Sequence, residues 1–148
     1  MLLPLWGDNL IQTHLGDPEM LILASRHYSR DRIGKKLGGP ARALILRNTP
    51  GTVLFLWQWP KDGMRRDRQN GFNCVMFRNE SPRLSSEIIL EAEQWATKLW
   101  GKNRFFTYVD ASKVRSINPG ACFKHAGWRL IGQSGSGKQL LAKNGSTT

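Results

Sequence analysis

Short apolar runs separated by turn-forming residues predict most of the strands of this chain. The runs are MLILAS (20–25), ALILRN (43–48), TVLFLWQW (52–59), FNCVMFRN (72–79) and RFFTYVD (104–110). Gly, Pro, Asn or Asp residues bound them, a pattern typical of buried strands. NTPGT between the second and third runs predicts a tight turn and therefore an antiparallel hairpin. RLIGQSGSGKQLLAK (129–143) predicts a closing hairpin.

The clearest helical pattern is SSEIILEAEQWATKLWG (85–101). Its apolar stripe is Ile88, Ala92, Trp95 and Leu99, and its polar stripe is Glu87, Glu91, Gln94 and Lys98. We expect Ser85 or Ser86 to cap its start and Gly101 to end it. Because it lies between two strands, it predicts a right-handed crossover between parallel neighbours.

A second, shorter helix is predicted within NPGACFKHAGWR (118–129). Asn118 suits the N-cap, and Pro119 suits the first helical position. Gly127 suits a left-handed residue after the last turn, with Trp128 folding back over Phe123. The helix is therefore expected to begin at the Asn118-Pro119 pair and to end before Gly127.

This short helix also carries a glycine, a cysteine and a histidine. Gly120 costs about 1 kcal/mol against Ala inside a helix, so either the first turn tolerates it or another group approaches its backbone closely. Cys122 and His125 lie three residues apart, but the other histidines complete no zinc-binding pattern. We therefore expect core packing for Cys122, a helix-end charge for His125, and no metal site.

The order of elements predicts a mixed α/β fold in a single domain spanning residues 1–148. The apolar fraction of 40% argues against disorder. Two cysteines without metal or disulfide spacing favour a reducing cytoplasm. The opening MLLPLWGDN lacks the basic region of a signal peptide, and no apolar run is long enough for a membrane span. We therefore expect no membrane partner.

Charge is the most unusual property of the composition. Lys and Arg total 22 against 11 acidic residues, which gives a net charge of +11. Such a balance indicates a polyanionic partner, with nucleic acid as the first candidate. Two basic segments, 26–36 and 61–71, can form a phosphate-contacting surface on one sheet. Their candidate DNA-binding residues are Arg26, Arg30, Arg32, Lys35, Lys36, Arg65, Arg66 and Arg68.

GQSGSGKQ (132–139) is similar to a phosphate-binding loop but lacks two of its requirements. Gln139 stands where a magnesium-binding Ser or Thr is needed, and too few residues follow to form the helix and sheet that such a loop joins. We interpret it as a hairpin turn.

Ser85, Ser86, Tyr108 and Asp110 lie at the ends of the predicted crossover unit. A helix N-terminus at the carboxyl edge of a strand can hold anionic groups or developing oxyanions. Capping by the serines and turn formation by Asp110 are the alternatives. The four residues form a candidate site.

Three blocks together resemble the phage Mom family of DNA-modification proteins: RHYS near the start, LSSEIILEAEQWA, and FTYVDASKVRSINPGACFKHAGWR (106–129). The resemblance covers roughly residues 20–143 and is most specific in the last block. Mom proteins are similar to the GNAT acyltransferase superfamily. The resemblance therefore implies a GNAT-like, mixed, mostly antiparallel central sheet flanked by helices, with the helix of 118–129 on the donor side of the site.

The resemblance also implies an activity, the conversion of adenine N6 in DNA to a carbamoylmethyl derivative that protects phage DNA from restriction enzymes in the bacterial cytoplasm. The implied catalytic residues are His27, Tyr28, Ser29, Ser85, Tyr108 and Asp110. The implied donor-binding residues are Ser85, Ser86, Asn118 and Gly120, and Lys113 and Arg115 are added to the DNA-binding set. Asp110 or His27 would accept a proton, Tyr28 or Tyr108 would donate a hydrogen bond or stack on the base, and the adenine would be flipped out of the duplex.

The chain departs from ordinary GNAT enzymes in one loop. SPRLSSE stands in place of the Gln/Arg-x-x-Gly-x-Gly/Ala turn that cradles the pyrophosphate of CoA. The donor is thus not identified, and we expect weak CoA binding or none. Two alternatives are a GNAT-type N-acetyltransferase acting on a protein or small amine, and a non-catalytic basic DNA-binding module. The net charge and the loop count against the first, and the polar residues at one sheet edge count against the second.

Overall fold

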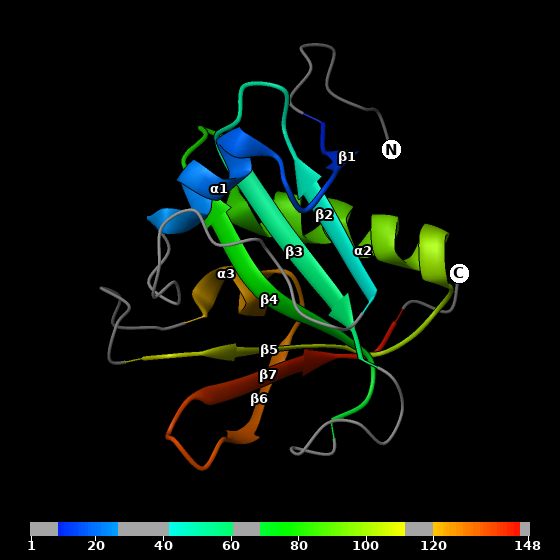
Figure 1. Cartoon of the computed structure of the whole chain (residues 1–148). Helices are drawn as coiled ribbons and strands as arrows, with labels where there is room; N and C mark the ends of the chain where they lie inside the picture. Colours follow the sequence, from blue (N-terminus) through cyan, green and yellow to red (C-terminus); the bar gives the residue numbers. More distant parts are fainter. Residues whose placement is uncertain (1–8, 27–41, 61–68, 112–119, 146–148) are drawn as a thin grey trace.

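One mixed sheet organises the molecule. The computed structural model of the chain describes residues 9–26, 42–60, 69–111 and 120–145. The sheet has seven strands in the order β1-β2-β3-β4-β5-β7-β6 (Figure 1). The elements are β1 (Ile11–Thr13), α1 (Pro18–Ser25), β2 (Arg42–Arg47), β3 (Val53–Trp59), β4 (Phe72–Asn79), α2 (Ser85–Trp100), β5 (Phe105–Val109), α3 (Ala121–His125), β6 (Arg129–Gln133) and β7 (Gln139–Lys143).

The pairing of the strands confirms the predicted fold class. β4 and β5 are parallel, and the other neighbours pair antiparallel. Both predicted hairpins, β2–β3 and β6–β7, are present. Because α2 connects the two parallel strands, the predicted crossover is also confirmed.

The prediction of a strand at 20–25 is wrong, because this segment belongs to helix α1. The Asp17 carboxylate caps the helix by accepting hydrogen bonds from the Glu19 and Met20 amides at 3.0 and 3.3 Å. Met20, Leu23 and Ala24 are buried at helical spacing. A short apolar run has the same composition in a buried strand and in a buried helix, so only the cap distinguishes the two.

The start of α2 also differs from the sequence-based expectation. Leu84 occupies the N-cap position and makes no side-chain capping bond, so neither Ser85 nor Ser86 is the cap. The Ser85 hydroxyl instead accepts a hydrogen bond from the Asn79 side chain at 3.0 Å. Gly101 ends the helix with a φ of 90°, as predicted.

The predicted polar stripe of α2 contains a buried carboxylate. Glu91 is only 7% exposed and forms a 2.8 Å ion pair with Arg83. Glu93 is also buried, and it accepts a hydrogen bond from the Trp128 indole at 3.0 Å. The predicted apolar stripe is buried at Ile88 and Ala92 but leaves Leu99 exposed. The helix therefore packs on the sheet with two charged groups inside the contact.

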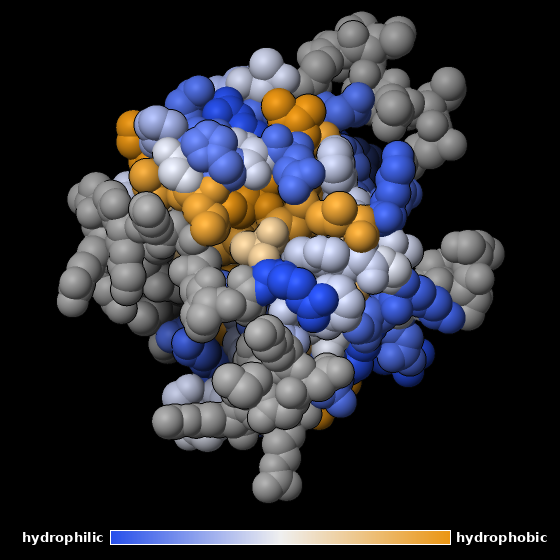
Figure 2. Space-filling view, turned by 45° about the vertical axis from the view of Figure 1, so that its right-hand side comes forward, coloured by the Kyte–Doolittle hydropathy of each residue, from blue (hydrophilic) through white to orange (hydrophobic). Residues whose placement is uncertain are grey.

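Hydrophobic cores lie on both faces of the sheet. On one face α2 and α3 cover a cluster that includes Phe55, Trp57, Phe72, Phe105 and Trp128. On the other face α1 covers Leu54, Leu56 and Met76. Figure 2 shows an apolar band bordered by hydrophilic side chains on the face that it presents. Alternate side chains along β3 enter opposite cores, which fixes the register of the sheet.

Candidate functional site

The sheet opens between its two parallel strands. β4 and β5 pair at Phe72–Phe105, Asn73–Phe106 and Cys74–Thr107 and do not pair beyond this point. The Thr107 hydroxyl donates a hydrogen bond to the Cys74 carbonyl at 2.8 Å, close to where the pairing ends. Both strands continue past this bond, so their carboxyl halves diverge and leave space between them.

A β-bulge at Val75 contributes to this divergence. Leu56 is opposite Met76 and Trp57 is opposite Cys74, so β4 carries one residue more than β3 at this point. Cys74 lies in the core beneath α2 and α3, whereas Met76 lies in the core beneath α1. Because a bulge bends its strand and increases the local twist, it helps to turn β4 away from β5.

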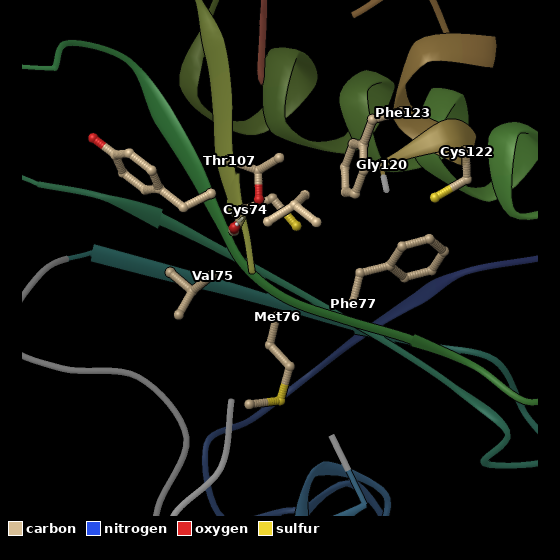
Figure 3. A pocket seen from close by; sticks show the side chains of 10 residues that line it. Cys74, Val75, Met76, Phe77, Thr107, Gly120, Cys122 and Phe123 are labelled. Carbon is tan, nitrogen blue, oxygen red and sulfur yellow. Dashed lines mark hydrogen bonds between the residues drawn. The ribbon is translucent and has the colours of Figure 1, made fainter. Parts of the chain in front are cut away.

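A cavity of about 150 Å³ occupies the opening. Its walls come from β4, β5 and α3 (Figure 3). The lining residues are Cys74, Val75, Met76, Phe77, Thr107, Tyr108, Val109, Gly120, Cys122 and Phe123. The Phe77 and Phe123 rings meet edge to face at 6.1 Å. The lining residues are therefore mostly apolar, and Thr107 and Tyr108 are the two among them that carry a hydroxyl group.

Helix α3 begins later than predicted. Its first residue is Ala121, and Gly120 is its N-cap with φ 75° and ψ 15°, so Asn118 and Pro119 do not start the helix. A Cβ at Gly120 would lie 2.5 Å from Cδ1 of Leu141. The close-approach explanation for Gly120 is therefore the correct one, and the approaching group is a core side chain.

The end of α3 follows the prediction. Gly127 has a φ of 96°, and the Trp128 amide donates to the Phe123 carbonyl at 3.0 Å. The rings of these two residues lie 4.7 Å apart. This hydrogen bond and the ring contact are the features of a glycine-terminated helix end, so α3 is anchored at the cavity wall.

The two cysteines of the cavity are poor nucleophiles. Burial raises the pKa of both the Cys74 and the Cys122 thiol. Both groups are therefore protonated at neutral pH, and the thiol is much less reactive than the thiolate. Cys122 also packs against the core, and His125 is exposed in the last turn of α3. In the described ranges no group of three or more His, Cys, Asp or Glu residues is placed to bind a metal ion.

The structure brings together two of the predicted site residues. Tyr108 and Gly120 line the same cavity. Asp110 follows the end of β5, whereas Ser85 and Ser86 begin α2 and are not part of the lining. The predicted residues His27, Tyr28, Ser29 and Asn118 lie outside the described residues.

Sequence reasoning missed most of the other residues that line the cavity, among them Thr107 and Phe77. The sequence reasoning did not single out Thr107, and nothing in RFFTYVD indicates that β4 and β5 separate. The bulge carries no signal in FNCVMFRN, because no glycine marks it.

Backbone amides of the loop between β4 and α2 donate hydrogen bonds to other groups of the protein. The Ser81 amide donates to the Asn79 side chain at 2.9 Å, and the Arg83 amide donates to the Ser81 hydroxyl at 3.2 Å. The Glu80 amide donates to the Thr52 carbonyl at 2.7 Å. These three amides are not available to a phosphate, so this part of the loop offers the pyrophosphate of CoA fewer donors than a glycine-rich turn would.

Arg26 is the one predicted DNA-binding residue in the described part of the chain. Its guanidinium binds the Glu80 carboxylate through two hydrogen bonds of 3.0 and 3.1 Å. Glu80 also binds Arg78 at 2.9 Å, and its contact with Arg26 lowers the pKa of the Glu80 carboxyl. The predicted residues outside the described ranges are Arg30, Arg32, Lys35, Lys36, Arg65, Arg66, Arg68, Lys113 and Arg115.

Comparison with solved structures identifies the architecture. Two crystal structures of aminoglycoside acetyltransferase AAC(6')-Ib superpose on this chain, one in complex with coenzyme A (TM-score 0.56) and one with coenzyme A and kanamycin (TM-score 0.57). Each is 12% identical in sequence and covers 92% of this chain and 94% of its own. The protein therefore has the GNAT fold, as the sequence predicts. No protein-family model matches the chain, and no curated protein does. Among the described segments, no helix is both long and apolar enough to cross a membrane.

Proposed function

We propose that this protein is a DNA-modifying transferase that converts adenine N6 to its carbamoylmethyl derivative. The observation that carries the proposal is a GNAT fold that opens beside Tyr108 in a chain with a net charge of +11. The fold supports group transfer at the opening, and the charge supports a polyanionic acceptor. The resemblance of residues 106–129 to the Mom family supplies the specific reaction.

The acceptor chemistry requires a base near the opening. The lone pair of adenine N6 is delocalised into the ring, so a group must remove a proton as the new N–C bond forms. The bond between the transferred carbon and the rest of the donor breaks in the same transfer, and the leaving group departs with that electron pair. Tyr108 lines the cavity, and Asp110 follows at the spacing that places strand residues on the same face. In this proposal Asp110 accepts the N6 proton, and the Tyr108 phenol holds the base or polarises the donor. Flipping the adenine out of the duplex costs a few kcal/mol.

The donor belongs to a class that does not depend on a glycine-rich phosphate cradle. The amides of Ser81 and Arg83 are committed to the Asn79 and Ser81 side chains. Ser85, Ser86 and Gly120 remain proposed donor-side residues, because the two serines begin α2 and Gly120 lines the cavity. Asn118, which lies outside the described residues, is kept in the proposed set. No step of the proposal runs through CoA.

An N-acetyltransferase of small amines is the second candidate, and the similarity to AAC(6')-Ib favours it. The kanamycin bound in one of those structures carries several amino groups, which are largely protonated at neutral pH. A protein with a net charge of +11 repels such a polycation and attracts a polyanion. Electrostatics therefore rank DNA above a cationic amine as the acceptor. A non-catalytic DNA-binding module is the third candidate.

Mass spectrometry of nucleosides from co-expressed plasmid DNA tests the proposal. We expect a modified deoxyadenosine with the wild-type protein, and a yield lower by on the order of a hundred-fold with Tyr108→Phe or Asp110→Asn. Gln94→Ala, an exposed polar change on α2, is the control and should retain the wild-type yield.

Unmodified DNA that is nevertheless bound tightly would support a binding module, and acetylation of amines would support the second candidate. Wild-type yields from both site variants at limiting protein would remove Tyr108 and Asp110 from the mechanism. Circular dichroism of each variant shows whether a loss of yield is a loss of fold.

A further inference from the structure

A second cleft lies at the end of the sheet opposite the reaction cavity. It has a volume of about 440 Å³ and forms where β5 begins, β6 begins and β7 ends. Its lining residues are Arg104, Gly127, Arg129, Ile131, Ala142, Lys143 and Asn144. The register brings them together, because Phe105 pairs with Lys143 and Ala142 pairs with Arg129.

Two arginines of this cleft differ from most others in the described part of the chain. Arg26, Arg47, Arg78 and Arg83 each form an ion pair with a carboxylate. Within the described ranges, no carboxylate lies within ion-pair distance of Arg104 or Arg129. Their charges are therefore not neutralised by neighbouring acids, although the chain has acids available elsewhere.

The cleft holds Arg104 in place and leaves most of its donors available. One of its terminal nitrogens donates to the Asn70 carbonyl at 3.0 Å, and its guanidinium lies 5.6 Å from the centre of the Phe106 ring. A guanidinium has five N–H donors, so several remain for a ligand. Arg129 is exposed on the edge strand β6. A partly fixed arginine beside an exposed one suits the two-oxygen geometry of a phosphate group.

Lys143 contributes to the wall of the cleft more than to its charge. Its ammonium lies 2.8 Å from the Glu93 carboxylate and donates to the Ala126 carbonyl at 2.8 Å. The end of β7 is also packed closely on the start of β5, since Gly145 leaves no room for a side chain against the Asn103 carbonyl. The cleft is therefore formed by closely packed strand ends. Its positive charges that lack a carboxylate partner are those of Arg104 and Arg129.

We propose that this cleft binds the phosphodiester backbone of the DNA substrate, an inference that rests on the proposed function. Arg104 directly precedes β5, and Tyr108 lies four residues further along the extended chain, which corresponds to about 13 Å. At about 3.4 Å of duplex per base pair, this distance spans about four base pairs. The cleft thus contacts a phosphate a few base pairs from the modified adenine, and it fixes the position of the duplex without reading its sequence.

A pair of charge-removing variants on one hairpin tests the cleft. Arg129→Gln and Lys138→Gln each remove one positive charge from an exposed side chain, Arg129 at the cleft and Lys138 at the far turn. Binding of a short fluorescent DNA duplex is measured by anisotropy over a series of NaCl concentrations. For Arg129→Gln we expect weaker binding and a salt-dependence slope that is smaller by about 0.9, and for Lys138→Gln a slope like that of the wild type.

The double variant Arg104→Gln/Arg129→Gln should reduce the slope by about 1.8. Arg129→Gln carries the test by itself if the Arg104 change disturbs the fold, which urea unfolding would show. Equal salt-dependence slopes for Arg129→Gln and Lys138→Gln, or no DNA binding by the wild-type protein, would contradict the proposal that this cleft binds DNA.

Nucleoside analysis of the same variants separates this inference from the proposed function. If adenine is modified but the salt-dependence slopes of Arg129→Gln and Lys138→Gln are equal, only the proposal that the cleft binds DNA is refuted. Unmodified adenine together with a selective loss at Arg129 refutes only the reaction and leaves the cleft as a DNA-binding site.

Discussion

Replacing Gly120 by alanine tests whether the wall of the cavity between β4 and β5 is fixed by packing. The residue has a φ of 75° and a ψ of 15°, a left-handed conformation that costs a side chain about 1–2 kcal/mol. Its Cβ would also lie 2.5 Å from Cδ1 of Leu141, which is fully buried. Overpacking of this kind adds about 1–3 kcal/mol. We therefore expect Gly120→Ala to lower the free energy of unfolding by about 2–5 kcal/mol.

Gly127→Ala is the matched control at the other end of the same helix. Gly127 has a φ of 96°, and the nearest atoms to its Cβ position are those of the Lys143 side chain, at 3.7 Å. Alanine there meets backbone strain without a clash, so we expect a loss of about 1–2 kcal/mol. The difference between the two variants isolates the contact with Leu141.

Urea unfolding followed by tryptophan fluorescence measures both variants, since Trp57 and Trp128 are buried in the core. The Gly120→Ala penalty is measured again in a Leu141→Ala background, where removal of the clash should reduce it to the Gly127→Ala value. An unchanged penalty in that background would refute the packing explanation. A Gly120→Ala protein of wild-type stability that no longer modifies DNA would instead show that Gly120 acts through the donor.

Two further predictions concern the helix cap and the donor. Burial alone would raise the pKa of Asp17, but hydrogen bonds from Thr13 and Arg47 outweigh it and lower that pKa. The contribution of the Asp17 charge to the free energy of unfolding is therefore fully present above the unfolded-state pKa near 4. It is lost as the pH falls through the lower folded-state pKa. Asp17→Asn removes the charge but keeps a capping oxygen. The free energy of unfolding of this variant should therefore be lower than that of the wild type at neutral pH, and the two values should converge in acid. A difference that stays constant with pH would contradict this role of the Asp17 charge. Because the Ser81 and Arg83 amides are occupied, calorimetric titration with acetyl-CoA should show weak binding or none, and micromolar affinity would contradict our interpretation of the loop.

The sequence predicted the sheet well because its signals there are local. Short apolar runs bounded by turn residues, NTPGT and the two helix-ending glycines are all signals that depend on residues close together in the sequence. MLILAS was assigned wrongly because five consecutive apolar residues have no period that distinguishes a strand from a helix turn. The informative residue was Asp17, which precedes the run and caps α1.

The cavity could not be predicted in the same way, because it depends on contacts between distant segments. The end of pairing after Cys74 and Thr107, the bulge at Val75 and the approach of Leu141 to Gly120 are relations between strands that lie far apart in the sequence. Tyr108 was proposed from its place at the end of a strand, and it lines the cavity. Thr107 was not proposed, because nothing in the sequence shows that its hydroxyl reaches the backbone of β4. Position at a strand end is visible in a sequence, whereas strand divergence is not.

The distribution of ion pairs shows which of the positive charges in the described structure are neutralised by neighbouring acids. Asp17, Glu80, Glu91 and Glu93 are each bound to an arginine or a lysine in the described structure. These acids serve the fold, so they neutralise structural cations and leave Arg104 and Arg129 uncompensated at one cleft. At physiological salt, exposed charges are screened beyond about 8 Å, so under the proposed function most of the +11 would act on the rate of encounter with DNA. Affinity depends on the cations that touch a phosphate, and within the described residues the second cleft is where such cations converge on a built surface.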